Sequence, residues 1–404
     1  MEQPNVDQRR ATRAEDATGA RIEREGAVVR VRSLAAARQV LRERDRTTQA
    51  GFTAEAIPTG YLKHHPILLS DGPLHDEQRS KVARYFAPKV VAERYTATMQ
   101  ACAAALLDRA EADGSCLVDD VALHYAVEVT AEVVGLTHAP VPAMSRRLVT
   151  FFNQPPFDIT RPDLGRTPRQ WAKAAVNALV PITRFHLADV RPAISSRRRS
   201  PRHDVISHLI AEGYTDTDIL VECVTYGTAG MVTTREFIAM AVWHVLGDAA
   251  LSERYRTAGQ AERFGILHEV IRLEPVVGHL YRRASAPFTL SDRDQECRVA
   301  PGDLIDVSVR QANADPDAVG ARPLGLCPGR TLPPGVNAAG LSFGDGAHKC
   351  PGQPLAILET DVFLLDLLGR GATIVAEPSV GWDDLIAGYT VRGLRIGFGR
   401  ASGL

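Results

Sequence analysis

The sequence predicts a mostly helical protein with small β-sheets. One observation is a capping-box arrangement at Thr215, with Asp218 three residues later, at the start of a stretch that Gly247 ends. About thirty residues at about 1.5 Å each make a helix long enough to cross a whole domain. A second observation is an apolar helical run from Gln353 to Leu368.

The third observation concerns domain organisation. No linker rich in Pro, Ser or Gly divides the 404 residues. We therefore expect a charged, mobile N-terminal segment over residues 1–26 and a single domain over residues 27–404.

The elements before the long helix follow in order. A short strand is expected over Ala27–Val31, and Ser33 is expected to cap a helix with an apolar face. Residues 52–69 contain prolines and a glycine, which predicts an irregular stretch. Further helical segments are expected over residues 90–135, 142–152, 170–195 and 203–213.

The most specific pattern is F-G-x-G-x-H-x-C-x-G over residues 343–352, formed by Phe343, Gly344, Gly346, His348, Cys350 and Gly352. Glycines let the backbone close around a large flat ligand, since they tolerate positive φ and carry no Cβ. A cysteine at the mouth of a helix feels the dipole and free amides, which favour thiolate over thiol. The simpler interpretation is a buried structural cysteine in a Gly-rich turn. The ten residues together resemble the haem-thiolate signature of the cytochromes P450, in which this cysteine is the iron ligand.

Two further motifs stand in the order that this family has. Glu269 and Arg272 share a helical face three residues apart, as in the E-x-x-R segment, and Arg282 follows them. The resemblance implies that Glu269 and Arg272 are structural. His75 and Arg79 lie four residues apart in a stretch that resembles the D-x-P-x-H-x-x-x-R helix. Either of the latter two residues alone could simply make a surface salt bridge.

The resemblance implies a fold and a cofactor site. Haem b would lie between the long distal helix and the proximal helix that follows Cys350. His75, Arg79, Arg282 and His348 would hold its two propionates, and Phe343, Gly344 and Gly352 would shape the loop around the ligand cysteine.

The middle of the long helix, Ala229-Gly230-Met231-Val232-Thr233-Thr234, is unusual for a helix interior because Gly and Thr lower helix propensity. It resembles the A-G-x-[D/E]-T-T segment, in which Ala229 and Gly230 would make room for dioxygen and Thr233 would deliver protons. Valine replaces the usual acid, which predicts an altered proton supply. The alternative for Thr233 is a hydroxyl bonded back to the carbonyl four residues earlier.

The resemblance implies an enzyme that uses dioxygen and NAD(P)H electrons, delivered by a ferredoxin or flavodoxin and its reductase. The substrate would be a small organic molecule, a secondary-metabolite intermediate. Val232 keeps open a P450 oxidase that performs phenol coupling or peroxide-driven oxidation. A haem-thiolate ligand or gas sensor is the non-enzyme alternative. By position, the substrate pocket would include parts of residues 52–69 together with Thr225, Thr228, Ala229, Val277, Gly278, His279, Tyr389 and Thr390.

Composition is compatible with this interpretation. A net charge of −1 argues against nucleic acid as the main partner. The chain opens with no signal peptide and no apolar stretch reaches eighteen residues without a charge, so we expect a cytoplasmic monomer without membrane contact. The six cysteines show no C-x-x-C spacing, so neither a zinc site nor a redox dithiol is indicated. Lys81, Arg84, Lys89 and Lys349 are either a docking patch for the electron donor or an ordinary solvated face.

Overall fold

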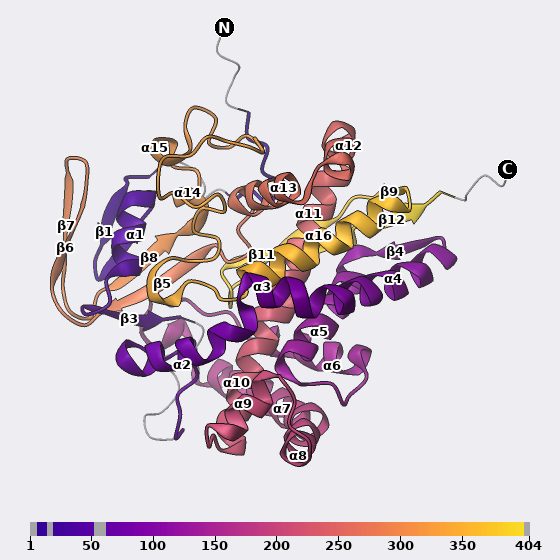
Figure 1. Cartoon of the computed structure of the whole chain (residues 1–404). Helices are drawn as coiled ribbons and strands as arrows, with labels where there is room; N and C mark the ends of the chain where they lie inside the picture. Colours follow the sequence, from indigo (N-terminus) through magenta and orange to yellow (C-terminus); the bar gives the residue numbers. More distant parts are fainter. Residues whose placement is uncertain (1–5, 14–18, 52–61, 400–404) are drawn as a thin grey trace, which may run out of the picture.

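The computed structural model describes residues 6–13, 19–51 and 62–399, and it confirms a mostly helical fold with small sheets (Figure 1). Short helices α1 (Leu34–Arg42), α14 (Val309–Ala312) and α15 (Pro316–Val319) lie near the strands. The other helices are α2 (Gly72–Phe86), α3 (Pro88–Val90), α4 (Thr96–Ala112), α5 (Val118–Val134), α6 (Val141–Val149), α7 (Pro168–Phe185), α8 (Arg191–Arg199), α9 (Val205–Ala211), α10 (Asp216–Tyr226), α11 (Thr233–Leu246), α12 (Ala249–Thr257), α13 (Gln260–Leu273) and α16 (Gln353–Gly369).

The strands form four small sheets. The largest has the order β1-β2-β8-β5-β3, in which only β2 and β8 pair in parallel. Its strands are β1 (Ile22–Glu25), β2 (Val28–Val31), β3 (Thr47–Ala50), β5 (His279–Ala284) and β8 (Leu304–Ser308). The others are the hairpins β6 (Phe288–Asp292) with β7 (Gln295–Val299) and β10 (Ser379–Asp383) with β11 (Gly388–Arg392), and the sheet of β4 (Ser115–Leu117), β12 (Arg395–Phe398) and β9 (Ala372–Ala376).

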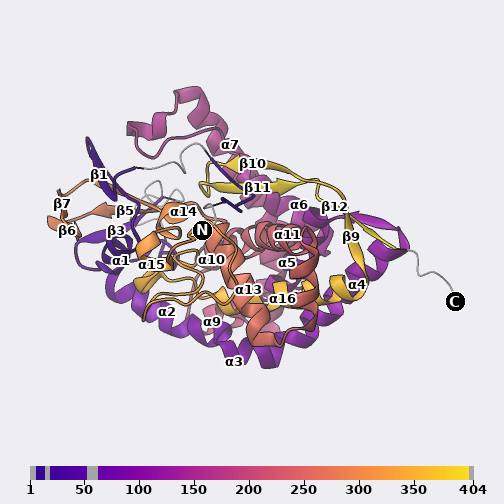
Figure 2. The ribbon, with the colours of Figure 1, turned by 90° about the horizontal axis from the view of Figure 1, so that it is seen from above.

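The long central helix is built as predicted at both ends. Thr215 and Asp218 form the expected capping box, and Gly247 is the C-cap. Between α10 and α11, a π-helical turn over Gly227–Val232 continues the helix. In the view from above, α11 lies between the β10–β11 hairpin and α16 (Figure 2). In the same view, α7 lies on one side of α11, which we call the distal side, and α2 and α3 lie on the opposite, proximal side.

Two hydrophobic cores hold these elements. The larger one joins α4, α5, α11, α13 and α16, whose buried faces are mostly apolar but also include charged residues such as Glu236, Arg272 and Glu359. The smaller one lies between α1 and the largest sheet. Ser33 caps α1 as expected, because its side chain accepts a hydrogen bond from the Ala36 amide. The helices thus enclose the centre of the molecule, and the largest sheet forms one side of it.

The N-terminal expectation needs a correction for residues 6–13 and 19–26. Strand β1 pairs antiparallel with β2 inside the segment that we expected to be mobile. Ala11 is fully buried, and its amide donates to Glu274 Oε2 over 3.1 Å. A short charged sequence can therefore be ordered by a buried carboxylate that needs backbone donors.

The irregular stretch expected over residues 52–69 is only partly described, because residues 52–61 lie outside the described residues. Residues 62–70 form turns that pack on α10 and contain the buried residues Leu62, Pro66 and Ile67. They lead directly into α2.

Candidate functional site

The loop before α16 is held closed by its own backbone. The Cys350 amide donates to the carbonyl of Phe343 over 2.7 Å, and the Gly344 amide donates to Leu341 over 2.8 Å. Gly346 has φ +67°, and a Cβ there would collide with the carbonyl oxygen of Leu41. Glycine is required at this position both by its backbone conformation and by the close approach of α1.

Cys350 lies at the start of α16, enclosed by protein, yet its side chain is accessible, so its sulphur faces an interior space. Burial raises the pKa of its thiol, against the amides of Gly352 and Gln353 and the charges of Arg79 and Lys349. The sequence-based argument considered only the helix terminus, and desolvation reverses its sign. In the protein alone, burial therefore favours the thiol of Cys350, whereas the sequence analysis expected the thiolate.

The four residues predicted to hold propionates divide into a pair of histidines with tilted rings in contact and two arginines. The rings of His75 and His348 have centroids 4.1 Å apart. Arg79 donates to the carbonyl oxygen of Lys349, next to Cys350. Arg282 is almost fully buried on β5.

Asp71 is a carboxylate that contacts His348 and interacts with the charge of Arg282. His348 Nε2 lies 3.0 Å from Asp71 Oδ1, and the Gln49 amide donates to Asp71 Oδ2 over 2.9 Å. Burial opposes ionisation, but these hydrogen bonds and the charge of Arg282 hold the pKa of Asp71 below its ordinary value. The sequence analysis did not include Asp71 among the site residues, although it begins the motif.

His75 and Arg282 could bind an anionic group larger than the Asp71 carboxylate. The pKa of His75 is lowered to about 4 by burial and by the nearby His348 and Arg79. Its Nδ1 is buried without a hydrogen bond, at 3.7 Å from Asp76. Burial also lowers the pKa of Arg282 to about 10, with only Asp71 opposing it. Buried, under-compensated donors beside an accessible thiol fit a ligand that carries carboxylates.

The distal helix exposes one small residue to the interior. Ala229 is exposed although it lies in the middle of the helix, within the π-helical turn. Gly230 is different, since a Cβ there would meet Thr130 Cγ2 at 3.2 Å. Gly230 thus allows α5 to pack closely, and its expected part in making room for dioxygen stays a prediction.

Thr233 adopts the alternative conformation that the sequence left open. Its hydroxyl donates to the carbonyl oxygen of Ala229. The side chain is only half-buried, so its oxygen can still accept a hydrogen bond. Val232 is buried in the core at the position where an acid is usual.

Glu359 is a functional candidate that the sequence analysis missed. It lies on α16 and is 1% exposed, and its Oε2 has no hydrogen bond among the described residues. Burial raises its pKa to about 8, against an opposing contribution from the hydroxyl of Thr234. The signal that could have found it is a carboxyl among the apolar residues of this helical run, which also contains Asp361 and Asp366.

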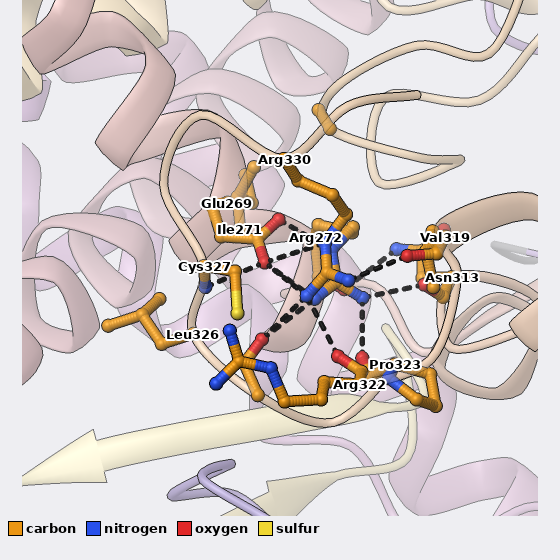
Figure 3. Close-up of polar contacts among 12 residues, drawn as sticks. Glu269, Ile271, Arg272, Asn313, Val319, Arg322, Pro323, Leu326, Cys327 and Arg330 are labelled. Carbon is orange, nitrogen blue, oxygen red and sulfur yellow. Dashed lines mark hydrogen bonds and ion pairs between the residues drawn. The ribbon is translucent and has the colours of Figure 1, made fainter. Parts of the chain in front are cut away.

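The expected pairing of Glu269 with Arg272 is confirmed and is part of a larger network (Figure 3). Arg272 Nε and Nη2 donate to the two carboxylate oxygens of Glu269 over 2.7 and 2.8 Å. Arg330 and the Cys327 amide donate to Glu269 Oε1, each over 3.0 Å. Arg272 also donates to the carbonyl oxygens of Asn313, Pro323 and Gly325, so it fastens the loop before α15 and the loop after it.

A cavity of about 510 Å³ opens beside β5, β8 and the turn between β10 and β11. His279 lines it, and its Nδ1 lies 2.6 Å from Asp306 Oδ1. The lining also includes Phe157, Tyr281 and Trp382. Aromatic and charged groups thus share this cavity.

The other predicted pocket residues are placed unevenly. Tyr389 is fully buried, and its hydroxyl donates to the carbonyl oxygen of Glu274 over 3.1 Å. Its assignment to the pocket is corrected, because alternation along β11 turns Tyr389 into the core and Thr390 the other way. Val277 and Thr390 are half-buried, and Gly278 is buried against the carbonyl of Ala387. Thr225 and Thr228 are half-buried and donate to carbonyls of their own helix.

The possible docking patch is largely neutralised. Lys81 Nζ lies 2.8 Å from Glu77 and also contacts Glu212, and Lys89 lies 3.8 Å from Glu93. Paired surface charges of this kind favour the interpretation as an ordinary solvated face.

Among the residues that the structure describes, no helix is both long and apolar enough to cross a membrane.

Comparisons with known proteins agree with this geometry. A model of the family "Cytochrome P450" matches residues 265–370, which include Glu269, Arg272 and Cys350. Cytochrome P450 109 of Bacillus spizizenii is 26% identical over 322 residues, which are 78% of this chain and 74% of that protein. Erythromycin C-12 hydroxylase of Saccharopolyspora erythraea is 27% identical over 338 residues, which are 80% of this chain and 76% of that protein. The crystal structure of the enzyme CYP109B1 from Bacillus subtilis has a TM-score of 0.75 at 19% identity, over 94% of this chain and 96% of that one, and shows the same fold.

Proposed function

The chain belongs to the cytochrome P450 family and is an oxidoreductase, and from that premise we propose that it is a haem-thiolate monooxygenase acting on a small secondary metabolite. The observation that carries the proposal is the accessible residue Cys350 just before α16, with Arg79 bonded to the carbonyl of the neighbouring Lys349 and with the rings of His75 and His348 in contact. Each further assignment depends on that geometry.

We propose that Cys350 is the ligand of haem iron. Phe343, Gly344 and Gly352 would shape the loop that holds it, while His75, Arg79, Arg282 and His348 would bind the two propionates. These bonds would replace the present contacts of His348 with Asp71, of Arg79 with the Lys349 carbonyl and of Arg282 with Gln49. Haem with a thiolate ligand supplies the activation of dioxygen for attack on an organic substrate.

Protons have to reach the distal side without an acid at Val232. We propose that Glu359 is the proton store, because it is buried, protonated at neutral pH and adjacent to Thr234. Thr233, the neighbour of Thr234, would act as a relay, because its oxygen can accept a proton while its own hydroxyl proton is passed on beside Ala229. A carboxyl with a raised pKa suits this task because it still carries a proton at pH 7.

The substrate class is inferred from the cavity beside β5. Its size of about 510 Å³ suits a drug-sized molecule, and its aromatic and charged lining suits a moderately polar one. The related erythromycin C-12 hydroxylase is named for a hydroxylation of such a metabolite. Electrons would come from NAD(P)H through a ferredoxin and its reductase.

The buried Val232 supports a second candidate, which is oxidative phenol coupling or peroxide-driven oxidation. Peroxide-driven oxidation needs fewer delivered protons than hydroxylation with dioxygen, because peroxide already carries them. Phenol coupling differs from hydroxylation in that no oxygen atom is transferred to the product. Under this candidate, Glu359 would have only a structural role.

The test is reconstitution of the haem-loaded protein with ferredoxin, its reductase and a panel of macrolide and phenolic metabolites. We expect a product that contains one oxygen atom from labelled dioxygen. A coupled or dehydrogenated product without label would move the assignment to the second candidate. Tight ligand binding with no product from any substrate would favour the sensor alternative.

The proposed proton store gives a pH dependence. Its pKa of about 8 is raised by burial, so the donor form of Glu359 is present below pH 8 and is lost as pH rises through it. We expect the fraction of NAD(P)H electrons recovered in product to fall from pH 7 to pH 9. Glu359→Gln should lower that fraction and remove its pH dependence. Thr233→Ala should increase peroxide release, whereas an unchanged product yield, peroxide release and NAD(P)H consumption in both variants would show that neither residue supplies protons.

A further inference from the structure

Residues 62–70, which lead into α2, are attached to α10 by two acidic side chains. Asp218 accepts a hydrogen bond from the His64 amide over 3.3 Å, and its Oδ2 lies 3.0 Å from His64 Nδ1. The His64 ring stacks on Tyr214 with centroids 4.0 Å apart. On the other side of the segment, Gln78 Nε2 donates to the carbonyl oxygen of His65 over 2.7 Å.

Glu222, one turn along α10 from Asp218, makes the innermost contact. Its Oε1 accepts a hydrogen bond from the Ile67 amide over 2.9 Å. Its Oε2 is buried and has no hydrogen bond among the described residues, and the residue is 3% exposed. Such a buried carboxyl has a large desolvation cost if it ionises. None of the chemistry proposed above uses it.

Residues 62–70 connect Glu222 to the residues that we propose bind the haem propionates. Directly after Ser70 come Asp71, which contacts His348, and α2, which carries His75 and Arg79. Ser70 itself donates to the carbonyl oxygen of Pro66 over 3.0 Å, so the segment is a compact turn that moves as a unit.

We propose that Glu222 is a positioning residue that fixes residues 62–70 against the distal helix while its carboxyl is neutral and releases them when it ionises. The inference rests on the proposed function in one respect: the released segment adjoins the site where we place haem and substrate. Release would loosen the start of α2 and widen access to the interior.

The charges around Glu222 determine the direction of the effect. Burial raises its pKa to about 7, against the hydrogen bond from the Ile67 amide, and the Asp218 charge raises it further. The other titratable groups near it are His64 and His65 on the segment, Cys223 and Tyr226 on α10, Tyr214, and Arg79 and Lys81 on α2. The thiol and both phenols have raised pKa values, so they stay uncharged at neutral pH.

The sign follows from linkage. When the segment opens, water reaches Glu222 and its pKa returns toward the ordinary value of 4.5. The closed state is therefore fully favoured below that value, loses stability as pH rises toward 7, and changes little above it. Between pH 5.5 and 7.5 these two values predict an increase of about twenty-fold in the opening equilibrium.

Hydrogen exchange of the haem-loaded protein tests this without any substrate. After correction for intrinsic exchange rates, the opening equilibrium of a peptide covering residues 62–70 should rise about twenty-fold from pH 5.5 to 7.5. Glu222→Gln keeps the hydrogen-bond acceptor without the charge, so the segment should stay closed. Its opening equilibrium should change less than about three-fold between pH 5.5 and 7.5. Glu222→Ala removes the acceptor, so the segment should be open at both pH values.

Asp216→Asn is the matched control, because Asp216 is an exposed acid on the same helix that pairs with Arg198. It should keep the wild-type pH dependence. A pH-independent wild-type segment, or a Glu222→Gln segment as pH-dependent as wild type, would overturn the proposal, the latter by assigning the effect to the His64 pair with Asp218. The wild-type series needs no variant to fold, and it can succeed even if reconstitution yields no oxygenated product.

Discussion

Cys350→Ser is expected to abolish the long-wavelength carbon monoxide band of the reduced haem protein. A serine hydroxyl has no thiolate to give to iron, and the loop offers no second sulphur at this point of the interior. Product formation should fall to background, a loss of about a thousand-fold or more if the thiolate supplies about 4 kcal/mol of the barrier reduction. Absorption and product assays on the same preparation measure both effects.

The matched control for Cys350 is Cys297→Ser. Cys297 is a half-buried thiol on β7, far along the chain from the loop before α16. The control should keep the wild-type band and activity. A Cys350→Ser protein that still shows the long-wavelength band would contradict the assignment of Cys350 as ligand, whatever its activity.

Local patterns predicted the parts of this fold whose causes are local. The capping box at Thr215 and the glycine at the end of α11 depend on side chains within a few residues, and both are confirmed. The fold class is confirmed for the same reason, since long apolar helical stretches specify helices wherever they pack. The loop before α16 was recognised from fixed glycine spacing, which reflects backbone sterics.

The sequence analysis was wrong where distant residues decide the outcome. The amides of Arg10 and Ala11 donate to Glu274, which is more than two hundred residues away. The orientation of Tyr389 depends on the register of β11, which a one-residue difference reverses. The pKa of Cys350 depends on burial by the whole fold. Helix propensity and motif spacing contain no information on long-range contacts, strand register or burial.

Missed residues share a different property, which is that their partners are backbone atoms or lie in separate motifs. Arg330 belongs to no motif, yet it completes the bonding of Glu269 and reaches the carbonyl oxygen of Val319. Glu359 has no charged partner, so only its presence in an apolar helix could have indicated it. Buried polar residues in apolar runs should therefore be treated as candidates before any motif is matched.

Glu269→Ala is expected to have the largest effect on stability. The carboxylate binds Arg272, which is 1% exposed, and also binds Arg330 and the amide of Cys327. Removing one partner of a buried ion pair leaves an uncompensated charge, at a cost of about 3–5 kcal/mol. That is a large fraction of the total stability of a typical protein, so little soluble haem-loaded protein should be recovered. Denaturant unfolding monitored by circular dichroism measures the difference.

Glu262→Ala provides the comparison within the same helix. Glu262 accepts from Arg254 over 2.7 Å, but both side chains are about half exposed, so its loss should cost less than about 1 kcal/mol. The two variants remove the same side chain from α13 and differ in burial. A Glu269→Ala protein that unfolds at the wild-type denaturant concentration, binds haem fully and makes a different product would show that Glu269 acts on the reaction and not on the two loops that Arg272 fastens. If both variants lose the same stability, the network in Figure 3 contributes no more than the half-exposed ion pair of Glu262.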